Sequence, residues 1–132
     1  MVQKMKIETW FRISLVATFF LNMAGTLVFL PPFRGLREFG GLPEAENSLY
    51  AWTIAIWIFF FGIGYLWLAF SKTRQRLFVL TGALGKSSFA ILLAVLAAIG
   101  ELPTRAAFAG LADLFIAAIF FVWLLKTRTE VQ

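Results

Sequence analysis

Four long apolar segments restrict this chain of 132 residues to one class of fold. They cover about residues 10–30, 50–70, 77–99 and 106–125. A helix of about 20 residues, rising 1.5 Å per residue, matches a hydrocarbon layer roughly 30 Å thick. Because 61% of the residues are hydrophobic and only 14% are charged, a soluble domain of this size could not bury its apolar surface. The sequence therefore predicts an all-α integral membrane protein, with residues 1–132 forming one antiparallel four-helix bundle.

One long connection and two short ones join these segments. The outer loop, residues 31–49, contains Pro31, Pro32 and Pro43, which favour turns, and we expect one short interfacial helix at about 33–39. The connections 71–76 and 100–105 are so short that segments 50–70, 77–99 and 106–125 should pack as antiparallel neighbours. The first segment also has features of a secretory signal peptide, but we expect it to be retained as a helix.

The basic residues predict how the helices are oriented. Three arginines lie on one side of the four-span arrangement, and eight basic residues lie on the other: Lys4, Lys6, Arg12, Lys72, Arg74, Arg76, Lys126 and Arg128. By the positive-inside rule, both termini are expected in the cytoplasm and the protein in the inner membrane as a multi-pass protein. The net charge of +5 thus reflects topology, and no nucleic-acid partner is expected.

Two charged residues, Lys86 and Asp113, lie inside the apolar segments. Each costs about 2.5 to 3.5 kcal/mol at the centre of a spanning helix, so each indicates a function or an ion pair. Helical spacing places Thr18 and Asn22 on one stripe of the first segment, and Tyr65 belongs to the second. Asn22 and Asp113 lie at similar depths, within reach of the Lys86 side chain. These five residues form the predicted polar binding site.

Small residues accompany the polar ones on the same helix faces. Glycine lets two helix backbones approach closely in lipid. The glycines assigned to helix packing are Gly25, Gly62, Gly82, Gly85 and Gly110.

The chain has neither Cys nor His. This excludes disulfide chemistry, Cys/His zinc sites and His-ligated haem, and it removes the commonest general base. We therefore predict no catalytic residues, no metal and no cofactor, although an apolar pocket would admit a lipid or a quinone.

Three short motifs carry a resemblance to a known family. They are Asn22, Gly25 and Thr26 before the Pro-terminated first helix, then Gly62, Gly64 and Tyr65, and finally the string from Gly82 to Lys86. Together they resemble small bacterial DoxX-like membrane proteins with four spans. The resemblance implies a four-helix bundle with cytoplasmic ends. Some members of that family are associated with thiosulfate and quinone oxidation or with oxidative-stress complexes, and no catalytic set of the family maps onto these positions.

Three functions remain open from the sequence. In the first, the bundle binds or passes a small molecule or ion, with Lys86 and Asp113 lining a cavity. In the second, it is an accessory or assembly subunit of a larger membrane complex and the polar residues only fix helix packing. The third is a quinone-linked membrane component that uses Lys86, or Arg105 with Glu101; it ranks last because no redox centre is evident. A homodimer is also expected.

Overall fold

The structure is a computed structural model that describes residues 1–128. Within these residues all regular structure is helical, and four helices are long and apolar enough to cross a membrane. This composition fits a small polytopic membrane protein, as predicted. The long helices are α1 (Val2–Phe29), α3 (Ser48–Phe70), α4 (Arg76–Ala98) and α5 (Thr104–Lys126), while η1 (Pro31–Phe33) and α2 (Arg34–Gly40) connect α1 to α3.

The helix boundaries follow the predicted segments with one large difference. Helix α1 begins at Val2 rather than near residue 10, because Lys4, Lys6 and Glu8 are good helix formers and extend the helix beyond its apolar part. The short helix expected at 33–39 is present as α2. It ends at Gly41, whose φ of 74° is a left-handed conformation that glycine adopts without strain.

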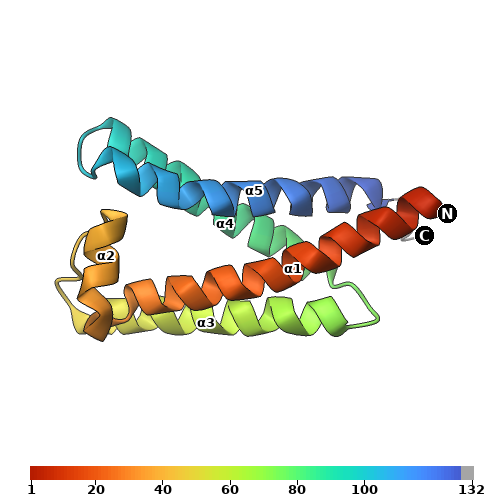
Figure 1. Ribbon diagram of the computed structural model, residues 1–132, viewed down its shortest axis with the longest axis horizontal. Coiled ribbons are helices and arrows are strands. Elements are labelled where there is room, and N and C mark those ends of the chain that lie inside the picture. Colours follow the sequence, from red (N-terminus) through yellow and green to blue (C-terminus); the bar gives the residue numbers. More distant parts are fainter. Residues whose placement is uncertain (129–132) are drawn as a thin grey trace.

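The long helices form two antiparallel pairs, α1 with α3 and α4 with α5 (Figure 1). The pairs converge at the end where both termini and the loop 71–75 lie, which we call the terminal end. They separate toward the opposite end, where α2 stands between them, and we call this the α2 end. The arrangement is therefore less uniform than a bundle with four equivalent contacts.

Glycines explain why each pair is close. A Cβ atom added at Gly62 of α3 would lie 3.0 Å from Cβ of Asn22 in α1. One added at Gly110 of α5 would lie 2.9 Å from Cα of Ala90 in α4. Real Cβ atoms essentially never approach as closely as 2.9 Å, so only glycine permits the backbone contact at Gly110, and at Gly62 a side chain would force Asn22 to shift.

Segments 50–70 and 77–99 contact each other through side chains, but they are not the close helix pair that the short loop predicted. The backbones of α3 and α4 do not approach each other closely, and the close partner of α3 is α1. Large rings cause the separation: Tyr65 of α3 and Phe78 of α4 lie between the two helices, with ring centroids 5.2 Å apart. The short loop makes α3 and α4 antiparallel, but large side chains keep their backbones apart. The predicted packing of α4 against α5 is confirmed.

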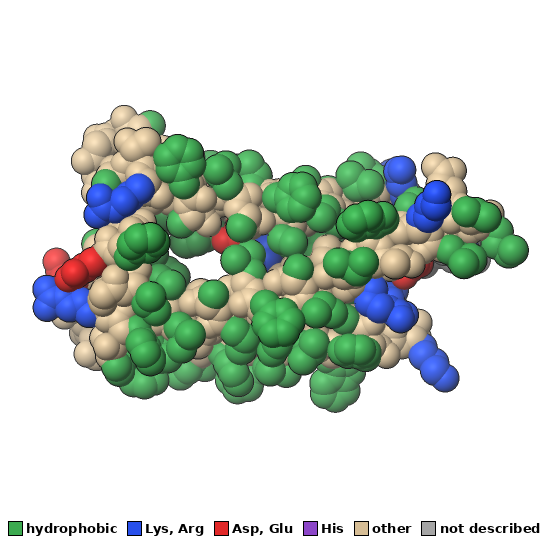
Figure 2. Space-filling view, viewed as in Figure 1, with side chains coloured by type: hydrophobic (Ala, Val, Ile, Leu, Met, Phe, Trp, Pro, Cys, Tyr) green, Lys and Arg blue, Asp and Glu red, His purple; other side chains and the backbone are tan. Residues whose placement is uncertain are grey.

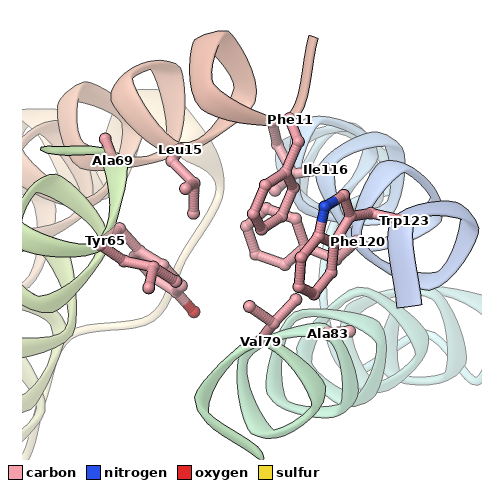
Figure 3. Close-up of a cluster of buried hydrophobic side chains, with 10 residues drawn as sticks. Phe11, Leu15, Tyr65, Ala69, Val79, Ala83, Ile116, Phe120 and Trp123 are labelled. Atoms are coloured by element: carbon pink, nitrogen blue, oxygen red, sulfur yellow. The ribbon is translucent and has the colours of Figure 1, made fainter. Parts of the chain in front are cut away.

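An apolar core joins the two pairs (Figure 3). Its residues lie in the half of each long helix nearer the terminal end. Its centre is a stack in which Phe11 of α1 lies 4.1 Å from the Trp123 ring of α5, with Phe120 edge-on at 5.9 Å from Phe11. All four long helices contribute to the core, which consists of Phe11, Leu15, Tyr65, Leu68, Ala69, Val79, Ala83, Ile116, Phe120 and Trp123.

Fewer contacts join the pairs at the α2 end. Helix α2 contacts both α1 and α5, and a terminal nitrogen of Arg105 donates a hydrogen bond of 3.2 Å to the Glu38 carbonyl. The Phe29 and Phe89 rings meet edge to face at 6.4 Å between α1 and α4. Figure 2 shows a hollow between the two pairs, bounded at one end by α2, with an acidic and a basic side chain at its inner edge.

Candidate polar binding site

The site is built around an ion pair between α4 and α5. Lys86 Nζ lies 2.5 Å from Asp113 Oδ1, and the two side chains are 10% and 16% exposed. Both side chains therefore face other helices rather than the outside of the molecule. The contact predicted from the two isolated charges is present.

Asn22 extends the ion pair to the other helix pair. Its Oδ1 accepts a hydrogen bond of 3.3 Å from Lys86 Nζ, while its Nδ2 donates one of 3.0 Å to the Ile58 carbonyl of α3. Gly62 lies opposite Asn22 and leaves room for it between α1 and α3. Through these contacts the polar side chains join all four long helices.

Tyr65 borders the site on the side of the apolar core. The Lys86 ammonium lies 5.9 Å from the centroid of the Tyr65 ring, within the range of a cation–π interaction. The Tyr65 hydroxyl points toward α4, where a side chain in place of Gly82 would overlap it. Within residues 1–128 this hydroxyl makes no hydrogen bond, so its proton is available to a ligand.

Two residues lie away from their predicted positions: Thr18 was predicted in the polar site, and Gly85 at a helix contact. Thr18 is fully buried, but its hydroxyl donates to the Ser14 carbonyl of its own helix at 2.6 Å and does not reach the ion pair. Gly85 lies on the exposed face of α4, and a Cβ atom there would meet no other helix within 4 Å. Gly25, in contrast, lies at a helix contact like Gly62, Gly82 and Gly110, because a Cβ atom added there would lie 3.4 Å from the Ile58 side chain of α3.

The ion pair leaves hydrogen-bonding capacity unused. An ammonium group has three N–H donors, and Lys86 directs them to Asp113 Oδ1 and Asn22 Oδ1 only. Asp113 Oδ2 accepts no hydrogen bond from any residue between 1 and 128. Together with the Tyr65 hydroxyl, the site thus offers two donors and one acceptor beside the hollow.

A second polar cluster, at the terminal end, was missed by the sequence reasoning. Glu8 of α1 accepts a hydrogen bond of 3.0 Å from Trp123 Nε1 and pairs with Arg74 Nε at 3.4 Å. Arg74 also donates to the carbonyls of Leu68 and Ser71. One signal was available: Glu8 is the only acidic residue before Glu38 and stands among basic residues. The cluster links α1, the loop 71–75 and α5.

Arg37 of α2, which belongs to the predicted outer loop, is buried, with 7% of its surface exposed. Its terminal nitrogen lies 3.4 Å from the Pro31 carbonyl, and its Nε has no partner among the described residues. Within residues 1–128 no group of three or more acidic, Cys or His side chains could hold a metal ion.

A comparison with protein-family models, curated proteins and solved structures returns no match. The resemblance to DoxX-like proteins, the link to quinones and the homodimer therefore stay predictions from the sequence. The function has to be argued from the geometry of the site.

Proposed function

We propose that this chain is an inner-membrane protein that binds or passes a small molecule or ion at the site formed by Lys86, Asp113, Asn22 and Tyr65. The observation that carries the proposal is the position of the ion pair. The pair lies between the two helix pairs, where Lys86 also contacts Asn22 of α1, and it keeps an unused donor and an unused acceptor. Figure 2 shows an acidic and a basic side chain at the inner edge of the hollow between the pairs. Charged residues inside apolar helices are costly and commonly mark ligand or ion pathways.

The charge distribution supports an orientation for this site. Eight basic residues lie in the helix ends and the loop at the terminal end, whereas Arg34, Arg37 and Arg105 lie at the α2 end. With the terminal end in the cytoplasm, as the positive-inside rule favours, the hollow belongs to the outer half of the bilayer.

The unpaired oxygen distinguishes a binding role from a purely structural one. A buried carboxylate that serves only helix packing is normally covered by several hydrogen-bond donors, because an unsatisfied charge is costly. Asp113 has a single partner, Lys86, and part of its surface remains exposed. This favours a ligand that completes the hydrogen bonding of Asp113.

One observation favours the second candidate, an accessory or assembly subunit whose polar site is structural. The contact of Lys86 with Asp113 joins α4 to α5, and the contact of Asn22 with Ile58 joins α1 to α3. Such a network fixes helix register whether or not a ligand binds. This candidate predicts that substitutions in the network change stability or complex assembly alone.

The test is to identify what the protein retains. Wild-type protein and the Asp113→Asn variant are purified from native membranes under mild conditions, and retained organic molecules and ions are quantified by mass spectrometry and elemental analysis. Glu101→Gln is the matched control, because Glu101 is exposed in the loop before α5.

We expect a compound or ion at defined stoichiometry in the wild type and the control, and its loss in Asp113→Asn with helix content unchanged. Identical retained material in all three proteins contradicts the proposal. Asp113-dependent co-purification of a larger protein complex, without such a compound, supports the assembly subunit instead.

A further inference from the structure

We infer that the ligand is an uncharged lipid with a hydroxyl head group, which enters sideways from the bilayer and places its head against Lys86, Asp113 and Tyr65. This inference rests on the proposed function and specifies its ligand class. It is carried by the hydrogen-bonding pattern of the site, its depth, the residues around the hollow and the position of α2.

The hydrogen-bonding pattern selects the head group. The charges of Lys86 and Asp113 cancel, so the site offers no net charge to attract an ion. What remains is one N–H of Lys86, the O–H of Tyr65 and the free Oδ2 of Asp113. A hydroxyl group both donates and accepts, so it can donate to Asp113 while accepting from Lys86 or Tyr65. A carboxylate head group could only accept, and an ammonium head group could only donate.

The depth of the site also disfavours a charged head group. Asp113 lies nine residues beyond Thr104, the first residue of α5, which corresponds to about 14 Å along the helix. A phosphate or carboxylate brought to this depth loses its hydration and finds no net positive charge in return. A hydroxyl loses far less and recovers its hydrogen bonds in the site.

The walls of the hollow suit an apolar chain. On each helix, the residues one to two turns from the polar residue toward the α2 end continue the same face. Those that keep exposed surface are Thr26 and Phe29 after Asn22, Phe89 after Lys86, and Ala109 before Asp113, whereas Leu93 and Ala106 are buried. Thr26 is the polar exception, and its hydroxyl is occupied by the Asn22 carbonyl of its own helix.

The position of α2 indicates the route. Helix α2 stands across the end of the hollow and is held to α5 by the hydrogen bond from Arg105 to Glu38. Gly41, directly after α2, packs against Pro103 and Arg105 so closely that no side chain fits there. The side between α1 and α5 is open in Figure 2, and in a membrane this side faces lipid. A ligand that reaches the site must therefore dissolve in the bilayer first.

Photolabelling in phosphatidylcholine vesicles tests the inference. The probe is hexadecanol with a diazirine near its hydroxyl end, and the unlabelled competitors are hexadecanol, hexadecane, palmitate and glycerol. We expect hexadecanol to reduce labelling of α1, α4 and α5 beside the site at least tenfold. At equal concentration, hexadecane, palmitate and glycerol should reduce it less than twofold.

Two variants link the labelling to the site. Asp113→Asn should reduce the competitor-sensitive labelling at least tenfold. Tyr65→Phe removes one donor, leaves the ion pair intact, and should reduce it about fivefold. Tyr50→Phe is the matched control, because Tyr50 is the other tyrosine of the chain and is exposed at the start of α3. It should label like the wild type.

The outcomes separate this inference from the proposed function. If palmitate competes more strongly than hexadecanol, the head group is not uncharged. If glycerol competes more strongly than hexadecanol, the ligand does not enter from the lipid. In both cases a site that depends on Asp113 still stands. Equal labelling of wild type, Tyr65→Phe and Asp113→Asn overturns the inference altogether. The proposed function is then decided independently by the material that the purified wild type retains.

Discussion

The two ends of the molecule use the same four helices in opposite ways. At the terminal end, aromatic rings from α1, α3, α4 and α5 fill the space between the helix pairs, and Glu8 with Arg74 and Trp123 fastens them together. At the α2 end, the pairs are joined by the Phe29–Phe89 ring contact and by the bridge that α2 makes. The ion pair of Lys86 and Asp113 lies where one arrangement changes to the other.

The comparison shows where the packing that holds the two helix pairs together is concentrated. In lipid, apolar surfaces alone do not drive helices together, so helices associate through close packing and hydrogen bonds. The terminal end therefore supplies most of the cohesion between the pairs, and the α2 end supplies less. Matched substitutions in the two regions should therefore differ in their effect on stability.

The largest effect is expected from Phe11→Ala. Phe11 is buried and stacked on Trp123, so its loss leaves a cavity and should lower the free energy of unfolding by about 4 kcal/mol. Phe29→Ala, the matched change at the α2 end, should cost about 1 kcal/mol because Phe29 is half-buried. Denaturant titration in detergent micelles measures both. Equal losses would show that the two ends are packed alike.

The next largest effect on stability is expected at the ion pair, which lies at the border of the two regions. Asp113→Leu leaves the Lys86 ammonium without its carboxylate and should cost about 3 kcal/mol. The double variant Lys86→Met with Asp113→Leu should recover all but about 1 kcal/mol, because no buried charge remains.

The same two proteins also separate a functional pair from a structural one. Both should fail to retain the ligand, although the double variant is stable. A double variant that is stable and still binds would assign the pair to packing alone.

Gly110→Ala and Gly85→Ala compare a close helix contact with an open face. The added methyl at Gly110 would lie 2.9 Å from Cα of Ala90 and should cost about 2 kcal/mol by pushing α4 and α5 apart. At Gly85 the methyl meets no other helix, so the change should stabilise the protein by up to about 1 kcal/mol through helix propensity. Thermal unfolding of the two variants measures the difference. Destabilisation by Gly85→Ala would instead reveal a partner covering that face.

The smallest effect is expected from Glu8→Gln at the terminal end. It weakens the interaction with Arg74 but keeps an acceptor for Trp123, so it should cost about 1 kcal/mol, and less at high salt because Glu8 is partly exposed. Glu101→Gln, at an exposed loop residue, serves as the control and should change nothing. If the two variants are equally stable, the Glu8 cluster does not stabilise the terminal end.

The sequence predicted the elements better than their arrangement. Long apolar segments fix the spans, since few other structures can bury so much apolar surface. The isolated charges of Lys86 and Asp113 predicted their pairing, because neither is tolerated alone in such a helix. The separation of α3 from α4 depends on how the rings of Tyr65 and Phe78 pack, and helical spacing does not report ring packing.

The polar cluster at the terminal end was beyond sequence reasoning for a related reason. Glu8 is 66 residues from Arg74 and 115 from Trp123, so no local pattern connects them. The burial of Arg37 depends on how α2 folds back between the helix pairs, which a loop rich in proline and glycine does not specify. Whether Thr18 turns toward the site or toward its own helix is a rotamer choice that spacing leaves undecided.

Distances between spin labels on α1 and α5 measure whether the helix pairs separate toward the α2 end. The chain has no Cys, so introduced cysteines give unique labels. Positions 13, 20 and 27 on α1 and 122, 115 and 108 on α5 are exposed and spaced by seven residues, which keeps each set on one helix face. In phosphatidylcholine nanodiscs, the label separation should increase from the pair 13 and 122, through 20 and 115, to 27 and 108. The same separation for all three pairs would contradict the account.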